Sequence, residues 1–246
     1  VYLPASRAEL WPCLNGDPRA LVFAGGTDLF VKLRAGKADA ASLVGLERIA
    51  DLKEIREEQG DIRIGAAATH DDILHHPLIA RHLPVLQQAI AMLGSPPIRA
   101  MGTLGGNLCT ASPAGDALPP LYVLSAQIEI ASASGTRLTP INEFIAGPGQ
   151  TRLNAGEIVA AVRVAKPAAD CLHHFEKVGQ RKSMACAVAS LAALIRRSSS
   201  GIVTEIRLAW GSVGPTVVTD SALEAFLVGK KLTAETLNDA AARIRR

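Results

Sequence analysis

Short apolar runs, broken by glycine and proline, predict a chain in which strands and helices alternate. Residues 20–24 form an apolar run that Gly25-Gly26 ends, which is typical of a buried strand entering a turn. Alternating or apolar runs predict further strands at 61–65, 126–133, 157–164, 173–178 and 202–210. The strands lack the regular spacing of a doubly wound sheet. The pattern therefore favours an α+β fold, with a seam near residues 165–172.

Capping and periodicity predict the helices. Thr69 opens one of them, with Asp72 three residues on as a variant of the capping box, and Pro77 interrupts it. The other predicted helices are 83–93, 184–196, 219–228 and 233–245. Residues 94–121 are rich in Gly, Pro, Ser and Ala, and predict a long irregular loop. Such loops are uncommon in compact domains and are often functional.

The composition is that of a globular protein and excludes several classes. The 246 residues are 48% hydrophobic and 20% charged, with a net charge of +3 and only 4% aromatic residues, which argues against a nucleic-acid surface. The four cysteines form no C-x-x-C pair, so we expect no metal or cluster in this chain. We find no apolar run long enough for a membrane span and no signal peptide, and expect a cytoplasmic protein. Because the chain begins at Val1 without Met and ends on Arg245-Arg246, we expect further residues at the ends.

Two glycine pairs and one lysine are the candidates for chemistry. Ala24-Gly25-Gly26-Thr27-Asp28 stands at a strand end, where glycines let the backbone approach a ligand and free N–H groups can hold an anion. Gly102-Thr103-Leu104-Gly105-Gly106-Asn107, continuing to Asp116, has the small and polar residues that suit contact with a large ligand. Lys177, on a predicted strand, could face a flavin or a phosphate. Taken singly, the first is more often an ordinary turn, the second is as often a plain surface loop, and the third is more often a solvated surface charge.

Other known motifs do not match. The histidines at 70, 75, 76 and 82 lack H-E-x-x-H spacing, and 210–214 lacks the first glycine of a nucleophile elbow. The chain contains no P-loop and no G-x-G-x-x-G dinucleotide fingerprint. A dinucleotide held by two separate glycine pairs remains the interpretation that uses most of these residues.

The chain resembles the FAD-binding, or medium, subunit of molybdopterin dehydrogenases, the family of the xanthine dehydrogenase and carbon monoxide dehydrogenase flavoproteins. Residues 24–29 resemble its first flavin loop and 102–116 its second, while 64–69, 156–159 and 211–216 follow in the family's order. The resemblance implies a two-subdomain FAD-binding fold of the vanillyl-alcohol-oxidase/PCMH type, followed by a C-terminal α+β domain with a three-stranded sheet. We expect an FAD-binding domain at 1–168, with subdomains of about 1–55 and 56–168, and a C-terminal domain at 169–246.

The same resemblance implies which residues hold non-covalent FAD. Residues 22–29 would wrap the pyrophosphate and 103–107 would continue that cradle, with further contacts elsewhere in the chain. The implied residues are Val22, Phe23, Ala24, Gly25, Gly26, Thr27, Asp28, Leu29, Leu93, Thr103, Leu104, Gly105, Gly106, Asn107, Asp116, Ile158, Val159 and Lys177. No catalytic residue and no metal ligand is expected.

The implied activity is electron transfer within a heteromeric complex. A molybdopterin subunit would oxidise the substrate, and the [2Fe-2S] clusters of an iron–sulfur subunit would pass electrons to FAD and on to NAD⁺ or another acceptor. The second loop lacks a cysteine-bearing insertion, and Thr27-Asp28 favours a hydroxylase of purines, nicotinate or similar heterocycles over carbon monoxide oxidation. Two alternatives stay open: a stand-alone FAD-dependent oxidase or reductase, and a non-catalytic nucleotide-binding module. Activity of the isolated chain would separate the first, and a flavin spectrum the second.

Overall fold

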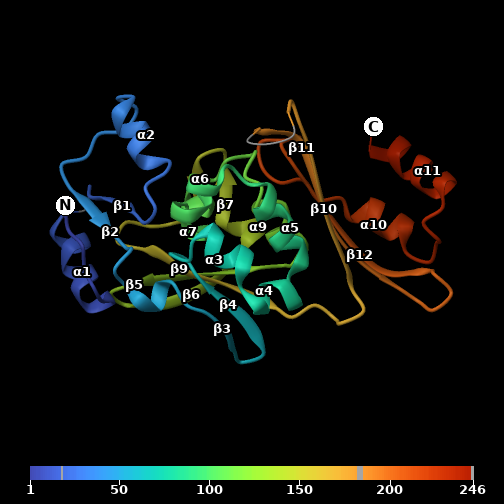
Figure 1. Ribbon diagram of the computed structural model, residues 1–246, viewed down its shortest axis with the longest axis horizontal. Coiled ribbons are helices and arrows are strands. Elements are labelled where there is room, and N and C mark those ends of the chain that lie inside the picture. The colour runs from blue at the N-terminus through green and yellow to red at the C-terminus, as the bar shows by residue number, and fades with distance from the viewer. Residues whose placement is uncertain (18, 182–184, 245–246) are drawn as a thin grey trace.

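The computed structural model describes residues 1–17, 19–181 and 185–244, arranged in three parts along the long axis (Figure 1). The N-terminal part contains α1 (Arg7–Gly16), β1 (Leu21–Phe23), α2 (Leu29–Arg34) and β2 (Leu43–Gly45), followed by a short turn of 3-10 helix (Ala50–Leu52). Strands β1 and β2 pair in parallel. The two ends of the chain lie at opposite ends of the molecule in this view.

A five-stranded antiparallel sheet forms the centre. Its order is β3-β4-β9-β5-β6, built from β3 (Ile55–Glu58), β4 (Asp61–Gly65), β5 (Gln127–Ser132), β6 (Gly135–Pro140) and β9 (Ile158–Ala165). The helices beside it are α3 (His70–His75), α4 (Pro77–His82), α5 (Pro84–Met92), α6 (Pro96–Met101), α7 (Leu104–Thr110), α8 (Leu118–Val123) and α9 (Ile141–Phe144). A small hairpin, β7 (Ile145–Gly147) and β8 (Gln150–Thr151), follows α9.

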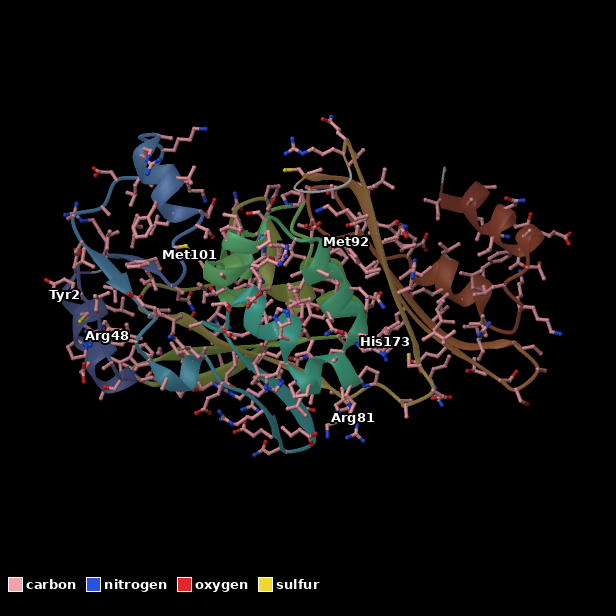
Figure 2. All side chains as sticks on the ribbon, viewed as in Figure 1. Tyr2, Arg48, Arg81, Met92, Met101 and His173 are labelled. Atoms are coloured by element: carbon pink, nitrogen blue, oxygen red, sulfur yellow. The ribbon has the colours of Figure 1, made fainter. Side chains whose placement is uncertain are left out.

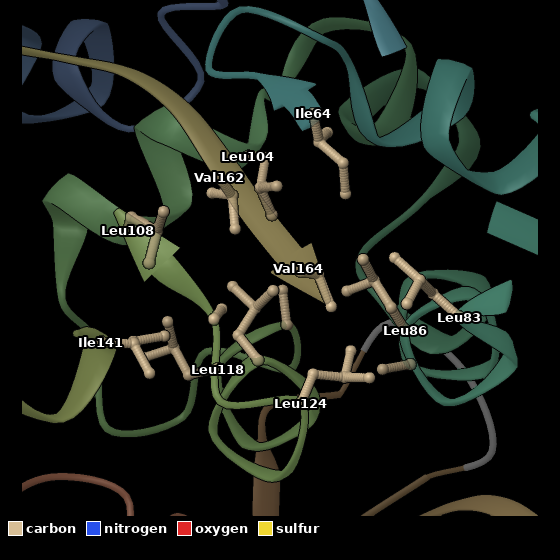
Figure 3. Close-up of a cluster of buried hydrophobic side chains, with 14 of the residues drawn as sticks. Ile64, Leu83, Leu86, Leu104, Leu108, Leu118, Leu124, Ile141, Val162 and Val164 are labelled. Atoms are coloured by element: carbon tan, nitrogen blue, oxygen red, sulfur yellow. The ribbon is translucent and has the colours of Figure 1, made fainter. Parts of the chain in front are cut away.

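The main hydrophobic core lies between this sheet and the helices, because alternate strand residues point toward them (Figure 3). Ile62 and Ile64 of β4 are fully buried in that core. Arg63, between them, is buried on the other face of the sheet, where its guanidinium binds Glu129 of β5 at 3.0 Å. Arg163 of β9 binds the same carboxylate at 2.7 Å, so the buried charge of Glu129 is compensated across three strands.

The C-terminal part is a three-stranded antiparallel sheet with two helices. Its strands are β10 (Leu172–Gly179), β11 (Ala187–Arg197) and β12 (Val203–Gly211), in that order, and its helices are α10 (Ser221–Leu227) and α11 (Ala234–Ile244). This matches the three-stranded sheet with helices that the family resemblance implies. Among the helices of the described ranges, none combines the length and the apolarity needed to cross a bilayer.

Most predicted elements are confirmed, including the capping details at α3. The Thr69 side chain accepts from the Asp72 N–H, and the Asp72 carboxylate accepts from the Thr69 N–H, as in a capping box. Pro77 ends this helical run and starts α4, for which the His76 side chain is the N-cap. Proline is favoured at a first helical position because its missing N–H would have no partner there.

Two predictions are wrong. The segment 184–196 was expected as a helix, but its described part forms the middle strand β11, and Met184 lies outside the described residues. Its small apolar residues fit both periodicities, and the pairing with β10 and β12 decides between them, as at Leu191, which pairs with Glu176 and Trp210. The segment 94–121 was expected as an irregular loop, but it contains α6, α7 and most of α8. Helix α6 begins with Pro96, and α8 has Pro119 at its second position.

Candidate functional site

The first glycine loop leaves strand β1 and turns against the end of α6. A Cβ on Gly25 would overlap the carbonyl oxygen of Met101, and Gly26 has φ +69° with the Phe30 ring beside it. Both glycines are therefore required by the fold itself. No described residue accepts a hydrogen bond from the backbone N–H groups of residues 25–28, so four successive donors remain free for a ligand.

The Asp28 side chain ties this loop to the second one. Its carboxylate lies 2.7 Å from Lys32 Nζ and accepts from the Thr110 hydroxyl at 3.2 Å. Asp28 stands at the N-cap position of α2, but its carboxylate makes these contacts and caps no backbone N–H. The contact to Thr110 joins residues 82 positions apart in the chain and brings the N-terminal part against α7.

The second glycine loop forms the start of α7. Thr103 is its N-cap, with its hydroxyl accepting from the Gly106 N–H at 3.2 Å. The Gly105 N–H donates to the Ala66 carbonyl at 2.8 Å, and a Cβ there would lie 2.7 Å from Ala66 Cβ. A Cβ on Gly106 would meet only Thr103 Oγ1, at 3.0 Å. Gly105 thus serves packing against the turn after β4, whereas Gly106 leaves its space open.

The two loops line a cavity of about 320 Å³. A neighbouring cavity of about 260 Å³ continues to the start of β9. The residues that line both are Val22, Phe23, Ala24, Gly106 and Cys109. Since they share these walls, the two cavities adjoin and could hold different parts of one long ligand.

A third, wider cavity of about 880 Å³ lies between α5, α6 and the start of the loop after β10. Met92 and Gly94, the chain neighbours of Leu93, line this third cavity, whereas Leu93 itself lines the first. Figure 2 labels Met92, which lines the third cavity. The residues that line the three cavities come from the N-terminal part, from the helices beside the central sheet and from β10.

Lys177 on β10 lines the third cavity and is held by Asp116. Its Nζ lies 2.6 Å from Asp116 Oδ2 and donates to the Met92 carbonyl at 3.2 Å. Burial raises the pKa of Asp116, against the opposing effect of Lys177. With side-chain exposures of 6% and 7%, Lys177 and Asp116 form a buried pair whose members depend on each other.

The predicted site residues are brought together with two exceptions. The first cavity is lined by Val22, Phe23, Ala24, Gly25, Gly26, Thr27, Asp28, Leu29, Leu93, Thr103, Gly106 and Asn107. Gly105, Ile158 and Val159 line the second cavity and Lys177 the third. Leu104 instead lies fully buried in the core, and Asp116 is not a lining residue but forms an ion pair with Lys177, which lines the third cavity.

Several buried polar atoms at these cavities have no partner. In residues that line the cavities they are His70 Nδ1, Arg99 Nε and Asn107 Oδ1, and Asp116 Oδ1 is a further one beside Lys177. Buried polar atoms are almost always hydrogen-bonded, so a polar ligand in these cavities would find partners here. Burial, and secondarily the charge of Arg99, lowers the pKa of His70 to about 4, so this ring is neutral.

Sequence reasoning missed His70 and Arg99 as lining residues. His70 was considered only as a metal ligand, and Arg99 lies in the stretch expected to be irregular. The signal for His70 was its position directly after the Thr69 cap and three buried alanines, since the first turn of a helix that follows such a strand end commonly faces a ligand. For Arg99 we find no comparable signal.

Comparison with known proteins identifies the family. Residues 1–167 match the FAD binding domain in molybdopterin dehydrogenase, and residues 174–246 match the CO dehydrogenase flavoprotein C-terminal domain. The chain is 34% identical to the nicotinate dehydrogenase FAD-subunit of Eubacterium barkeri, over 90% of this chain and 76% of that protein. It is 32% identical to the putative xanthine dehydrogenase FAD-binding subunit of Escherichia coli (strain K12), over 95% of this chain and 80% of that protein.

Solved structures agree with this assignment. Quinoline 2-oxidoreductase from Pseudomonas putida 86 superimposes with a TM-score of 0.93 at 30% identity, covering 98% of this chain and 83% of that chain. Carbon monoxide dehydrogenase from Hydrogenophaga pseudoflava gives 0.92 at 31% identity, covering 98% and 84%. The chain therefore belongs to the family of FAD-binding subunits of molybdopterin dehydrogenases, as the sequence resemblance predicted, and it has the α+β FAD-binding fold.

Proposed function

From membership of this family, we propose that the chain passes electrons from iron–sulfur clusters of a partner subunit through FAD to NAD⁺ or another acceptor. The observation that carries the proposal is the meeting of two distant glycine loops at adjoining cavities that contain free donors and orphaned polar atoms. A dinucleotide supplies both the length and the polar groups that such an arrangement requires.

The residues present fit FAD in chemical character. The four free N–H groups of residues 25–28 suit a pyrophosphate, because successive backbone donors favour anions. Because Gly106 has no side chain, a ligand can approach its backbone closely. Asn107 Oδ1 and His70 Nδ1 are buried without a hydrogen-bond partner. The roles of the eighteen residues named from the sequence remain part of this proposal, as does the domain division at residues 168/169.

Bound FAD would supply exchange of one or two electrons, which no side chain of the protein provides. The chain's own residues would hold the cofactor and set the charge around it. The Asp116 carboxylate would hold the Lys177 ammonium group in place at the third cavity. We assign no acid or base of this chain to the organic substrate, whose oxidation belongs to the molybdopterin subunit of the proposed complex.

Relatives support the proposed partners. One is named the carbon monoxide dehydrogenase medium chain of Hydrogenophaga pseudoflava, and a solved structure from that organism lacks the Mo-pyranopterin moiety of its molybdenum cofactor. We extend this to the present chain as a complex with a molybdopterin subunit and an iron–sulfur subunit, located in the cytoplasm. A purine, nicotinate or similar heterocycle is the proposed substrate class of the complex.

Flavin content tests the proposal. The chain, produced alone and together with its two partner subunits, should contain about one FAD, and acid precipitation should release it into the supernatant. A complex assembled from the partners without this chain should contain none. Flavin that stays with the partners, or a chain that takes up no FAD, would contradict the proposed function.

A further inference from the structure

Arg99 stands between the first and third cavities. Ile98 and Gly102 line the first cavity, while Arg99 lines the third, so α6 forms the wall that separates them. Arg99 shares the third cavity with Lys177. Neither the sequence patterns nor the family resemblance assigned a role to Arg99.

The charge of Arg99 is not compensated by a carboxylate. Its Nη1 donates to the carbonyls of Leu93 at 3.0 Å and Gly94 at 3.4 Å, and its Nε is buried without a partner. No carboxylate of the described residues forms an ion pair with it. Lys32 and Lys177, by contrast, have carboxylate partners at 2.7 and 2.6 Å. An arginine stays protonated in proteins, so this positive charge is permanent.

The field of Arg99 reaches across the wall. After burial, the charge of Arg99 is the second cause that lowers the pKa of His70, which lines the first cavity. The same Coulomb interaction by which Arg99 disfavours a positive charge on His70 favours a negative charge near His70. Because Arg99 donates to the Leu93 carbonyl at 3.0 Å, a ligand group beside Leu93 in the first cavity is exposed to the same field.

We propose that Arg99 stabilises negative charge on the reduced flavin ring and so raises its reduction potential, an inference that depends on the proposed binding of FAD. Uptake of two electrons from the partner's iron–sulfur clusters, with one proton from water, leaves the ring with one net negative charge. The free N–H groups of residues 25–28 serve the pyrophosphate in the first cavity. Arg99 lines the third cavity with Lys177 and donates to the Leu93 carbonyl, and the proposal puts the flavin ring at this end of the site. A charge near the ring is a recognised way for a protein to tune a flavin.

Charge-changing variants of the FAD-loaded chain test this role. The midpoint potential of the flavin is measured by reductive titration against reference dyes in the wild type, Arg99→Gln, Arg99→Lys and Arg81→Gln. Arg99→Gln should shift the potential to more negative values, whereas Arg99→Lys, which keeps the charge, should stay near the wild type. Arg81 lies exposed at the lower edge of the molecule (Figure 2), so Arg81→Gln is the control for loss of one positive charge.

A purely structural role for Arg99 gives a different result. Both Arg99 variants would then release the carbonyls of Leu93 and Gly94 and lose FAD to a similar degree, with no change in the potential of the flavin that remains. An unchanged potential in Arg99→Gln overturns the inference. If that variant holds no flavin, Arg99→Lys decides, because a lowered potential with the charge retained also overturns it. A wild-type chain that binds no FAD would instead refute the proposed function.

Discussion

Substitution of Gly106 separates cofactor binding from folding. Outside its own helix backbone and chain neighbours, a Cβ there has Thr103 Oγ1, at 3.0 Å, as the only atom of the described residues within 4 Å. Alanine is favoured over glycine inside a helix by about 0.8–1 kcal/mol. The tight contact weakens the cap between the Thr103 hydroxyl and the Gly106 N–H, an interaction of about 1 kcal/mol. Since these effects oppose each other, the free energy of unfolding of Gly106→Ala should lie within about 1 kcal/mol of the wild type.

FAD affinity should respond much more strongly. Gly106 lines both the first and the second cavity, so an added methyl group takes space from the cofactor. We expect Gly106→Ala to weaken FAD binding at least about tenfold, or about 1.4 kcal/mol, and Gly106→Val to weaken it further. Flavin fluorescence titration measures the affinity and urea unfolding the stability. Gly16→Ala, at the end of α1, is the matched control, because among the described residues no atom outside its own helix backbone and chain neighbours lies within 4 Å of the added Cβ. A Gly106→Val chain with wild-type affinity would refute the cradle at α7.

Two further predictions concern charges at the cavities. Removing either member of the Asp116–Lys177 pair should lower the free energy of unfolding by about 3–5 kcal/mol, because each single substitution leaves a buried charge unpaired. In urea unfolding, the double variant Asp116→Asn/Lys177→Met should lose less stability than the sum of the two single variants. Strict additivity would show that the two groups do not interact. Because the folded pKa of His70 is lowered from 6.5 to about 4, its stabilising effect is complete above pH 6.5 and is lost as the pH falls toward 4, by up to about 3 kcal/mol. In denaturant titrations over this pH range, His70→Gln should therefore lose less stability than the wild type. The contribution of His173, whose pKa burial also lowers, is the same in both proteins. Equal losses in the two proteins would contradict a neutral, buried His70 ring.

Local signals were sufficient for much of the fold. Alternation located β4, and the Thr69 cap with Pro77 located the boundary between α3 and α4, because these features depend on residues a few positions apart. Segment β11 could not be predicted this way. Its apolar residues fit a helix, and only pairing with strands on both sides, one of them formed later in the chain, fixes it as extended.

The candidate site shows the same division. Both glycine loops were visible in the sequence, and the structure places them on one cavity. The contacts that hold them together were not visible, since Asp28 and Thr110 are 82 residues apart and Asp116 and Lys177 are 61 apart. The role proposed for Arg99 could not be predicted, because it depends on the lack of an ion-pair partner among the described residues, and only the three-dimensional surroundings reveal this.

Partner dependence of flavin reduction tests the central claim most directly. The FAD-loaded chain is mixed anaerobically with purines, nicotinate and aldehydes, and the flavin absorbance is followed first alone and then with the iron–sulfur and molybdopterin subunits added. The account predicts no substrate-dependent bleaching by the chain alone and rapid bleaching once both partners are present. Rapid bleaching of the isolated chain by any of these substrates would contradict the account and identify a stand-alone flavin oxidase or reductase.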